Sequence, residues 1–461
     1  MRQFFIPLSC VLVLSACHDK VQKEENTQEA WEQITYPETK KENVEDTYFG
    51  EKVIDPYRWL EDDQSAETEA WVKAQNAVTF GYLHSIPFRD KIKAQAEKLW
   101  NHEQLTAPFR VGEYTYYYKN NGLQNQNVLY RKGKDGKEEL FLDPNGFAAD
   151  GTTSLAEVNF SKDGSLVCYL ISEGGSDWRK AIVMNTQTRE QVGDTIVNIK
   201  YSGGYWYKNE GFYYCSYDKP KGSELSEKTD QNKLYYHKLG TPQSSDALIF
   251  GGKPEEKNRF VGGYVSNDEN YLIIRGEETT SGGKLWIKDL RKPNSPLVNI
   301  LNDYSSDTFV LAIKGDKIYF QTNLNAPNGK IVVADLKDPT PTHWKDLIPE
   351  TENVITPVIA GKYILAHYMK DAISEVKQYD FEGKFIREIK LPALGTVTLE
   401  RKKKMKATSL LKTSILLPVS TNYTWKKETP SSIGLRKWTS TLMILNPNKY
   451  STPPRMEPKY L

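Results

Sequence analysis

The chain has 461 residues, in which 61 Lys and Arg are balanced by 60 Asp and Glu, and 12% of the residues are aromatic. The resulting net charge of +1 argues against a nucleic-acid partner, and the aromatic content is typical of a globular protein rich in β-strands. The cysteines have neither disulfide-framework nor metal-ligand spacing: Cys10, Cys17, Cys168 and Cys215. Since no glycine-rich phosphate loop occurs either, we expect no metal and no cofactor.

The first residues have the features of an export signal. Arg2 precedes an apolar stretch from Phe4 to Leu14 that is too short to span about 30 Å of hydrocarbon. The following Ser15-Ala16-Cys17 matches the bacterial lipobox, in which the cysteine is lipidated. We therefore predict a signal peptide over 1–16 and a lipidated tether over 17–33, which would anchor the protein to the cell envelope facing the periplasm. An ordinary signal peptide with a chance cysteine is the alternative.

The only convincing helical periodicity lies in the N-terminal segment, residues 34–105. Asp62 or Ser65 is placed to cap a helix that continues through Val78. A second helix is predicted from Lys91 to Trp100.

From Gly112 the hydrophobic period changes to two, as in β-strands. Strand-like runs recur every 46 to 59 residues, beginning at Tyr114, Leu166, Phe212, Tyr271, Lys317 and Tyr363. Several strands per unit at such a period indicate a β-propeller, whereas a sandwich has turns about every 8–12 residues and no longer period. We therefore predict a mainly β fold, a propeller of the seven-bladed type over 106–398 with six blades recognisable and the seventh disrupted.

An ordered string follows the tether, with DTYFG at 46–50 and VIDPYRWLED at 53–62. It resembles the N-terminal signature of prolyl oligopeptidases, the serine peptidases that cut short peptides after proline. The resemblance continues through FLDPN at 141–145, GSDWR at 175–179 and KLYYH at 233–237, and covers residues 34–398. It implies that the N-terminal helices pack onto a C-terminal α/β-hydrolase domain and that the propeller admits only small peptides to the active site. Phe160 and Phe250 fall where the family presents propeller side chains to the substrate, although each also fits an ordinary apolar position beside a strand.

The residues that would cleave a peptide are not found in the sequence. The family's serine lies on a G-x-S-x-G elbow and is followed by an Asp and a His, and no G-x-S-x-G occurs here. Ser176 comes nearest but falls inside a predicted blade. The six histidines are interpreted as surface or core residues, so we assign no catalytic residue and expect the α/β-hydrolase domain to be absent.

The last 63 residues differ in charge from the rest. Residues 399–461 contain 13 basic and 3 acidic residues, a net of +10, against a net of −9 before them. One interpretation is a polybasic interaction tail. The other, which we favour, is a frameshift near codon 398 with premature termination, because the shifted frame allows segments that resemble the family's seventh blade and its return to the hydrolase domain.

Two functions follow from these observations. The first is the substrate-gating propeller portion of a prolyl oligopeptidase, with short proline-containing peptides as its ligands. The second is a non-catalytic propeller lipoprotein that acts as a binding or scaffold module. Under either function we expect a monomer held at the membrane through Cys17.

Overall fold

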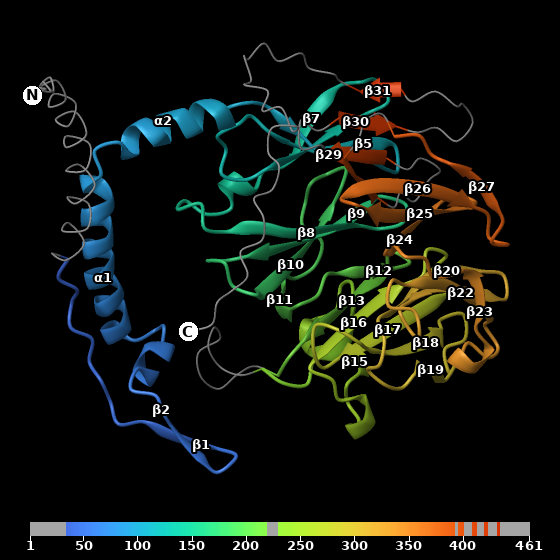
Figure 1. Ribbon diagram of the computed structural model, residues 1–461, viewed down its shortest axis with the longest axis horizontal. Coiled ribbons are helices and arrows are strands. Elements are labelled where there is room, and N and C mark those ends of the chain that lie inside the picture. Colours follow the sequence, from blue (N-terminus) through green and yellow to red (C-terminus); the bar gives the residue numbers. More distant parts are fainter. Residues whose placement is uncertain are drawn as a thin grey trace, which may run out of the picture. The chain divides into compact units, whose positions relative to one another are not determined.

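The computed structural model describes residues 34–218, 229–391 and 395–400, together with three short strands after residue 407 (Figure 1). The chain divides into two compact units, one of residues 1–325 and 332–345, the other of residues 326–331 and 346–461. Within the described ranges no helix is long and apolar enough to cross a membrane. The predicted signal peptide, Cys17 and the tether lie outside the described residues.

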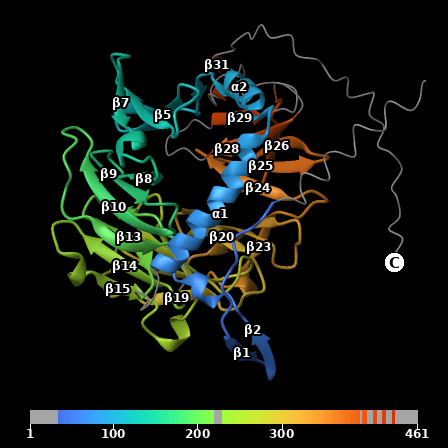
Figure 2. The ribbon, with the colours of Figure 1, turned by 90° about the vertical axis from the view of Figure 1, so that its left-hand side faces the viewer.

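The N-terminal segment contains a hairpin and two helices. Its elements are β1 (Glu45–Tyr48), β2 (Glu51–Ile54), the 3-10 helix η1 (Arg58–Glu61), α1 (Ala66–Ser85) and α2 (Arg89–Trp100). The strands β1 and β2 pair antiparallel (Figure 2). Of the two predicted caps, Ser65 is the one used, since its hydroxyl accepts a hydrogen bond from the amide of Thr68 at 3.1 Å. Both predicted helices are confirmed.

The chain then forms a β-propeller of six blades, each a sheet of four or five strands. Blade 1 contains β3 (Gln104–Leu105), β4 (Phe109–Val111), β5 (Tyr114–Asn120), β6 (Val128–Lys132) and β7 (Glu138–Leu142). Blade 2 contains β8 (Ser154–Phe160), β9 (Leu166–Ser172), β10 (Trp178–Asn185) and β11 (Ile196–Lys200). Blade 3 contains β12 (Tyr205–Tyr207), β13 (Gly211–Ser216), β14 (Lys233–Lys238) and β15 (Ala247–Phe250).

The remaining blades follow the same pattern. Blade 4 contains β16 (Phe260–Val265), β17 (Tyr271–Glu277), β18 (Lys284–Asp289) and β19 (Leu297–Leu301). Blade 5 contains β20 (Thr308–Lys314), β21 (Lys317–Thr322), β22 (Lys330–Asp335) and β23 (Lys345–Ile348). Blade 6 contains β24 (Ile355–Ala360), β25 (Tyr363–Lys370), β26 (Ile373–Tyr379) and β27 (Phe385–Glu388). Short 3-10 helices η2 to η5 lie at Pro144–Gly146, Gln243–Ser245, Pro254–Glu256 and Pro341–His343.

The predicted propeller is confirmed, and its six strand-like runs correspond to one position in the blades. They are the strands β5, β9, β13, β17, β21 and β25. In blades 2 to 6 this strand is the second of four and is paired on both sides. It therefore has the most buried side chains, as in β13, where every residue is buried.

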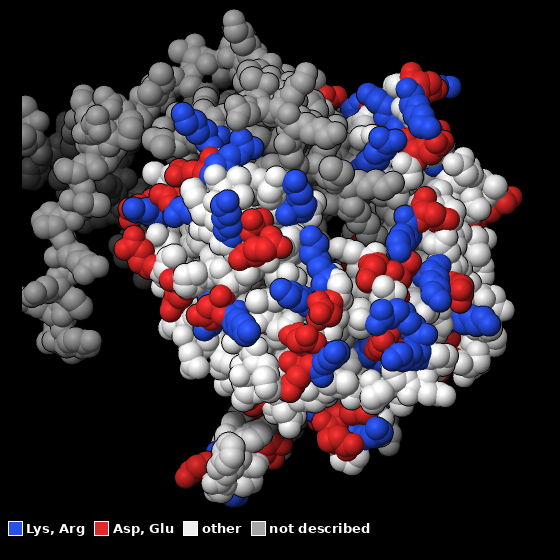
Figure 3. All heavy atoms as spheres, turned by 90° about the vertical axis from the view of Figure 1, so that its right-hand side faces the viewer, with Lys and Arg blue, Asp and Glu red and all other residues white. Residues whose placement is uncertain are grey.

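Hydrophobic side chains between neighbouring sheets hold the blades together. Blades 2 and 3 share one cluster, which includes Leu170, Ile199 and Phe212. Blades 3 and 4 share another, and further clusters join blades 1 and 2 and blades 4 and 5. In the second unit, Leu365 and Val376 of blade 6 pack with Val397. On the face seen in Figure 3, lysines and arginines alternate with acidic residues among the described side chains.

The alternation of strand direction sorts the connections of blades 2 to 4 into two groups. The β9–β10, β13–β14 and β17–β18 loops and the links between blades lie at one end of the strands, which we call the loop end. The turns after the first strands lie at the opposite end. There Lys162 of blade 2 donates to Glu269 of blade 4 at 2.9 Å, and the other oxygen of Glu269 accepts from the amide of Lys208 at 3.0 Å. Turns from three blades are thus joined by one carboxylate.

Part of the predicted aberrant tail is described as strands. The strand β28 (Thr396–Glu400) pairs with β29 (Thr408–Lys412), which pairs with β30 (Val419–Asn422), and β31 (Ser431–Ile433) completes the sheet. The fading alternation after residue 398 had not predicted these strands. The rest of the tail lies outside the described residues, and the frameshift stays a prediction.

Candidate functional site

The two predicted cleft residues lie in the interior of the first unit. Phe160 is 9% exposed, and its ring centroid lies 4.5 Å from that of Tyr116 in blade 1. Phe250 is 0% exposed and lies 4.7 Å from Trp286 in blade 4. Neither ring offers surface for contact with a peptide in this conformation. Both therefore occupy the ordinary apolar positions that the sequence also allowed.

The other residues considered in the sequence, Ser176, Cys168 and Cys215, lie in surroundings that indicate structural roles. The hydroxyl of Ser176 accepts a hydrogen bond from the amide of Trp178 at 3.1 Å, as expected for a loop serine. Cys168 and Cys215 are both buried and unpaired, and burial raises the pKa of Cys215 to about 12, so its thiol is unreactive at neutral pH. Among the described residues no group of three or more His, Cys, Asp or Glu is arranged to hold a metal ion.

One serine–histidine pair occurs in blade 6, within the second unit. Nε2 of His367 lies 2.7 Å from Oγ of Ser374. Ser374 is only 4% exposed, and its Oγ accepts a hydrogen bond from the amide of Val397 at 2.9 Å. This hydroxyl therefore attaches β28 to blade 6 and is not available to a substrate.

The His367 site predicts an acid-sensitive second unit. Burial lowers the pKa of His367 below the ordinary value of 6.5. Between the lowered value and 6.5 the unfolded chain binds more protons than the folded one, so stability is lost as the pH falls through this window. We expect the melting temperature to decrease between pH 7.5 and pH 5, and this decrease to be smaller in His367→Gln. Thermal unfolding across this range measures it, with the exposed His84→Gln as the control; equal slopes in both variants would contradict the prediction.

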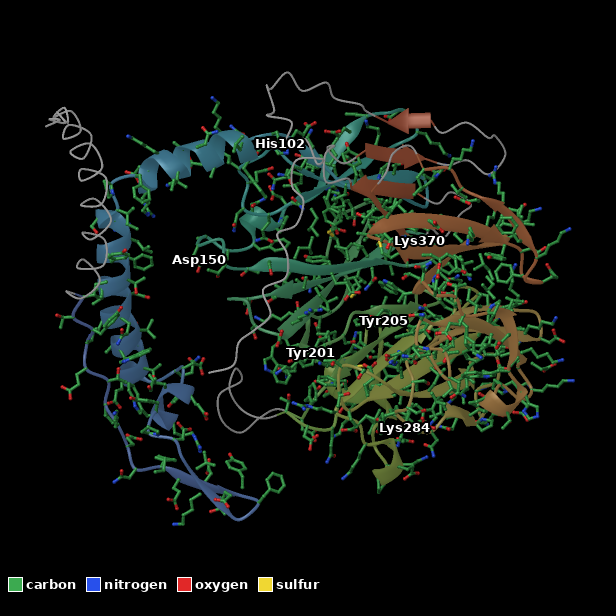
Figure 4. All side chains as sticks on the ribbon, viewed as in Figure 1. His102, Asp150, Tyr201, Tyr205, Lys284 and Lys370 are labelled. Carbon is green, nitrogen blue, oxygen red and sulfur yellow. The ribbon has the colours of Figure 1, made fainter. Side chains whose placement is uncertain are left out.

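At the loop end, side chains from three blades form an aromatic and basic cluster. We call Trp178, Lys200, Tyr201, Tyr217, Arg259 and Phe260 the loop-end cluster. The ring of Tyr201 lies between two others, with centroids 6.2 Å from Tyr217 and 5.6 Å from Phe260. The ammonium of Lys200 lies 4.8 Å from the ring of Trp178 and 5.4 Å from that of Tyr201. Tyr201 is labelled in Figure 4, where it lies in the link between β11 and β12.

Hydrogen bonds and an unusual backbone hold this cluster in place. The hydroxyl of Tyr201 donates to Asp177 at 3.0 Å, and that of Tyr217 donates to the carbonyl of Arg259 at 2.6 Å. Tyr201 has a φ of 54° and Asn198 one of 58°, a region that residues with side chains rarely adopt. The conformation persists because the hydroxyl of Ser216 donates to the carbonyl of Asn198. The segment around Lys200 and Tyr201 is therefore fixed before any ligand arrives.

Close packing behind the cluster explains the two glycines that follow it. A Cβ atom at Gly203 would lie 2.4 Å from the carboxylate of Glu157, and one at Gly204 would lie 2.5 Å from the sulfur of Cys168. Glu157 belongs to the first strand of blade 2 and accepts a hydrogen bond from Asn159 at 2.8 Å. The link between blades 2 and 3 can therefore approach blade 2 only because it lacks side chains at these positions.

Exposure and electrostatics differ among the members of the cluster. Tyr201 is 47% exposed, whereas Tyr217 is 5% exposed and packs against the Tyr201 ring. Burial, and then the hydrogen bond to Asp177, raise the pKa of Tyr201, so this hydroxyl remains a donor at neutral pH. Burial lowers the pKa of Lys200, although the nearby charge of Asp177 acts in the opposite direction.

Similar pairs of a cation and a ring continue along the loop end. The ammonium of Lys284 lies 5.0 Å from the ring of Tyr304, and the guanidinium of Arg275 lies 3.9 Å from that of Phe309. Aromatic faces with donors beside them suit extended peptides that contain proline, because the prolyl ring packs on an aromatic face and the carbonyl groups need donors. The described loop end is therefore suited to binding peptides.

Sequence reasoning did not identify this cluster. Its members come from residues 178, 200–201, 217 and 259–260, and only the fold brings them together. The GSDWR string at 175–179 marked one part of it, and the sequence Lys200-Tyr201-Ser202-Gly203-Gly204 carried a further signal, an aromatic residue beside paired glycines at a blade boundary.

Comparisons with known proteins agree with the fold. The family model described as "Prolyl oligopeptidase, N-terminal beta-propeller domain" matches residues 36–431. A prolyl endopeptidase of Elizabethkingia miricola is 50% identical over 364 residues, which are 79% of this chain and 51% of that protein. One of Elizabethkingia meningoseptica is 49% identical over 366 residues, 79% of this chain and 52% of that protein. The chain thus spans about half the length of these relatives.

Solved structures give the same result. A structure from a study of two prolyl endopeptidases and their inter-domain dynamics superposes with a TM-score of 0.77 at 26% identity, covering 87% of this chain and 59% of that one. Prolyl oligopeptidase B of Galerina marginata, bound to a 35-residue hydrolysis and macrocyclization substrate, superposes with a TM-score of 0.76 at 26% identity, covering 87% of this chain and 60% of that one.

Proposed function

Because the chain belongs to the prolyl oligopeptidase family, as its N-terminal β-propeller portion, we propose that it binds and gates short proline-containing peptides for a serine peptidase active site that the described residues do not contain. The observation that carries this proposal is the loop-end cluster. Tyr201 is exposed, is flanked by two further rings and is fixed by its hydrogen bond to Asp177. Such a preformed aromatic surface binds a prolyl residue with little loss of entropy.

The exposed apolar residues of the N-terminal helices support the second part of the proposal. In α2, Ile92 is 60% exposed, and Leu99 and Trp100 are each 64% exposed. No residue of α2 is buried, so this helix lacks a hydrophobic partner among the described residues. A C-terminal α/β-hydrolase domain, which the family resemblance implies, is the partner we propose.

Peptide binding by the isolated chain tests this function directly. We expect a short proline-containing peptide to bind and the same peptide to remain uncleaved, since the described residues provide no activated serine. Tyr201→Ala should weaken binding at least about tenfold, because stacking and hydrogen-bonding surface is lost. Calorimetric titration measures the affinity and a chromogenic prolyl substrate measures turnover.

Two controls make the test decisive. Phe385→Ala removes an exposed aromatic residue of β27 in blade 6, outside the peptide-binding surface proposed here, and should leave the affinity within about threefold of the original. Cleavage that a serine-directed inhibitor abolishes would refute our assignment of no catalytic residue. Equal affinities of the Tyr201→Ala variant and the unaltered chain would refute the loop-end cluster as the peptide site.

Export and anchoring are part of the same proposal. The lipobox-like sequence ending in Cys17 supports a lipid-anchored protein on the periplasmic side of a bacterial envelope, and we propose that it functions there as a monomer. The changed charge after residue 398 supports a frameshift and a truncated product. Metabolic labelling with a fatty acid in the parent and in Cys17→Ser tests the anchor, and resequencing codons 390–465 tests the frameshift.

A propeller lipoprotein that only binds is the second candidate function. The observation that favours it is the same cluster, which recognises peptides without chemistry of its own. Joining residues 34–398 to the remaining half of the Elizabethkingia miricola relative separates the two candidates. A chimera that cleaves short prolyl peptides supports the peptidase function, whereas one that folds and binds peptide but never cleaves it favours the binding module.

A further inference from the structure

Three basic residues are buried in the described part of the chain, and they differ in how their charge is balanced. They are Arg131, Lys200 and Arg275. Arg131 is paired with Glu139, and Arg275 with both Asp307 and Glu277. A buried charge without such partners is costly, so pairing is the expected arrangement.

Lys200 is the exception. The residue is 7% exposed, yet among the residues that the structure describes none pairs with its ammonium or accepts a hydrogen bond from it. Among the described residues, the ammonium lies over the ring faces of Trp178 and Tyr201. Asp177 is near enough to influence it electrostatically, but one oxygen of this carboxylate already accepts from the hydroxyl of Tyr201. The ammonium is not one of the buried polar atoms that lack a partner, so it reaches solvent at the end of a buried side chain, and its N–H donors are open to an acceptor.

The surroundings of Lys200 are suited to an anion attached to an apolar body. Trp178 and Tyr201 place aromatic rings beside the ammonium, and the guanidinium of Arg259 lies over the ring of Phe260, which contacts Tyr201. Arg259 is exposed and has no ion pair within the described ranges. A flat carboxylate at Lys200 would have aromatic surface next to it and a second cation near by.

We propose that Lys200 binds the C-terminal carboxylate of the short peptides that dock on the loop-end cluster. This inference rests on the proposed function and adds a substrate class to it: peptides that end close to their bound proline. A chain end is what separates a short peptide from a loop of a folded protein. The buried cation thus gives the propeller a chemical means of selecting small peptides, in addition to steric exclusion.

The experiment compares one peptide with and without its terminal charge. The probes are N-acetyl-Gly-Pro-Ala as the free acid and as the C-terminal amide, titrated calorimetrically into the full chain. We expect the acid to bind about tenfold more tightly than the amide, as for one charge-assisted hydrogen bond. In Lys200→Met the acid should bind no better than the amide. Lys180→Met, which removes an exposed lysine of β10 paired with Glu173, should keep the tenfold difference.

A second measurement does not depend on the folding of a variant. Reductive methylation of the unaltered chain at pH 8, followed by mass spectrometry, should show slower modification of Lys200 with the acid present and no slowing with the amide. A peptide amide that carries a glutamate side chain serves as a third probe. If it protects Lys200 as well as the acid does, the site reads side-chain carboxylates and the chain-end assignment is overturned.

The remaining outcomes separate the two proposals. If acid and amide bind equally and Tyr201→Ala weakens both, the role of Lys200 is refuted and the loop-end cluster remains the peptide site. If neither peptide binds and neither protects Lys200, both proposals are refuted.

Discussion

Replacing Phe250 by alanine is expected to lower the free energy of unfolding by about 3–5 kcal/mol. The side chain is 0% exposed and belongs to the cluster shared by blades 3 and 4, where its ring lies 4.7 Å from that of Trp286. Truncation leaves a cavity the size of the ring, which the strands on either side cannot close because their pairing fixes their spacing. Urea unfolding monitored by tryptophan fluorescence measures the loss.

Leu248→Ala is the matched control for this prediction. Leu248 lies two residues earlier in β15 but is 47% exposed, so its truncation should cost less than about 1 kcal/mol. If Phe250→Ala were as mild as Leu248→Ala, Phe250 would not be a core residue. If it weakened peptide binding while stability was kept, the original cleft assignment would be supported.

The contrast between Phe250 and Tyr201 shows what the sequence could and could not reveal. The family resemblance indicated that propeller side chains face the substrate, but Phe160 and Phe250 are the last residues of β8 and β15. A shift of one residue along a strand reverses the face to which a side chain points. The assignment of Phe160 and Phe250 to the cleft stays a prediction, and in this conformation both rings are buried.

The regular parts of the fold were predictable because their cause is local. A strand paired on both sides needs apolar residues on both faces, and this requirement made all six second strands visible in the sequence. The cap at Ser65 follows from a single side chain and the amide three residues later. Edge strands such as β12 (Tyr205–Tyr207) are short and half-buried, and their pattern was too weak to predict.

The loop-end cluster was not predictable because its causes are distant in the chain. Tyr201 meets Phe260 only because blades 2, 3 and 4 are adjacent, and the positive φ angle at Tyr201 could not be predicted from its residue type. A lysine at the end of a strand is normally read as solvated. That the Lys200 side chain is buried against two aromatic rings, with no ion pair to it among the described residues, follows from the fold and not from the local sequence.

A second large effect is expected in blade 3, where Asp246→Ala should cost about 3–5 kcal/mol of the free energy of unfolding. Asp246 and His237 are each 2% exposed in their side chains, and Nδ1 of His237 donates to Oδ1 of Asp246 at 2.8 Å. The other oxygen accepts from the hydroxyl of Tyr214, also at 2.8 Å. Removing the carboxylate leaves two buried donors without an acceptor, and neither can reach water. Urea unfolding measures the loss.

The exposed pair of His343 and Asp338 provides the control, since it has the same chemistry at 3.2 Å with side chains 58% and 53% exposed. Asp338→Ala should change stability by less than about 1 kcal/mol, because water replaces the lost acceptor. Asp246→Asn should fall between the two, as an amide oxygen can still accept one of the two hydrogen bonds. If Asp246→Ala and Asp338→Ala lowered the free energy of unfolding by equally small amounts, the buried pair would contribute no more stability than a surface pair. The prediction of a large loss in blade 3 would then be wrong. If Asp246→Asn were as severe as Asp246→Ala, the loss would come from the missing negative charge beside His237 and not from the number of acceptors.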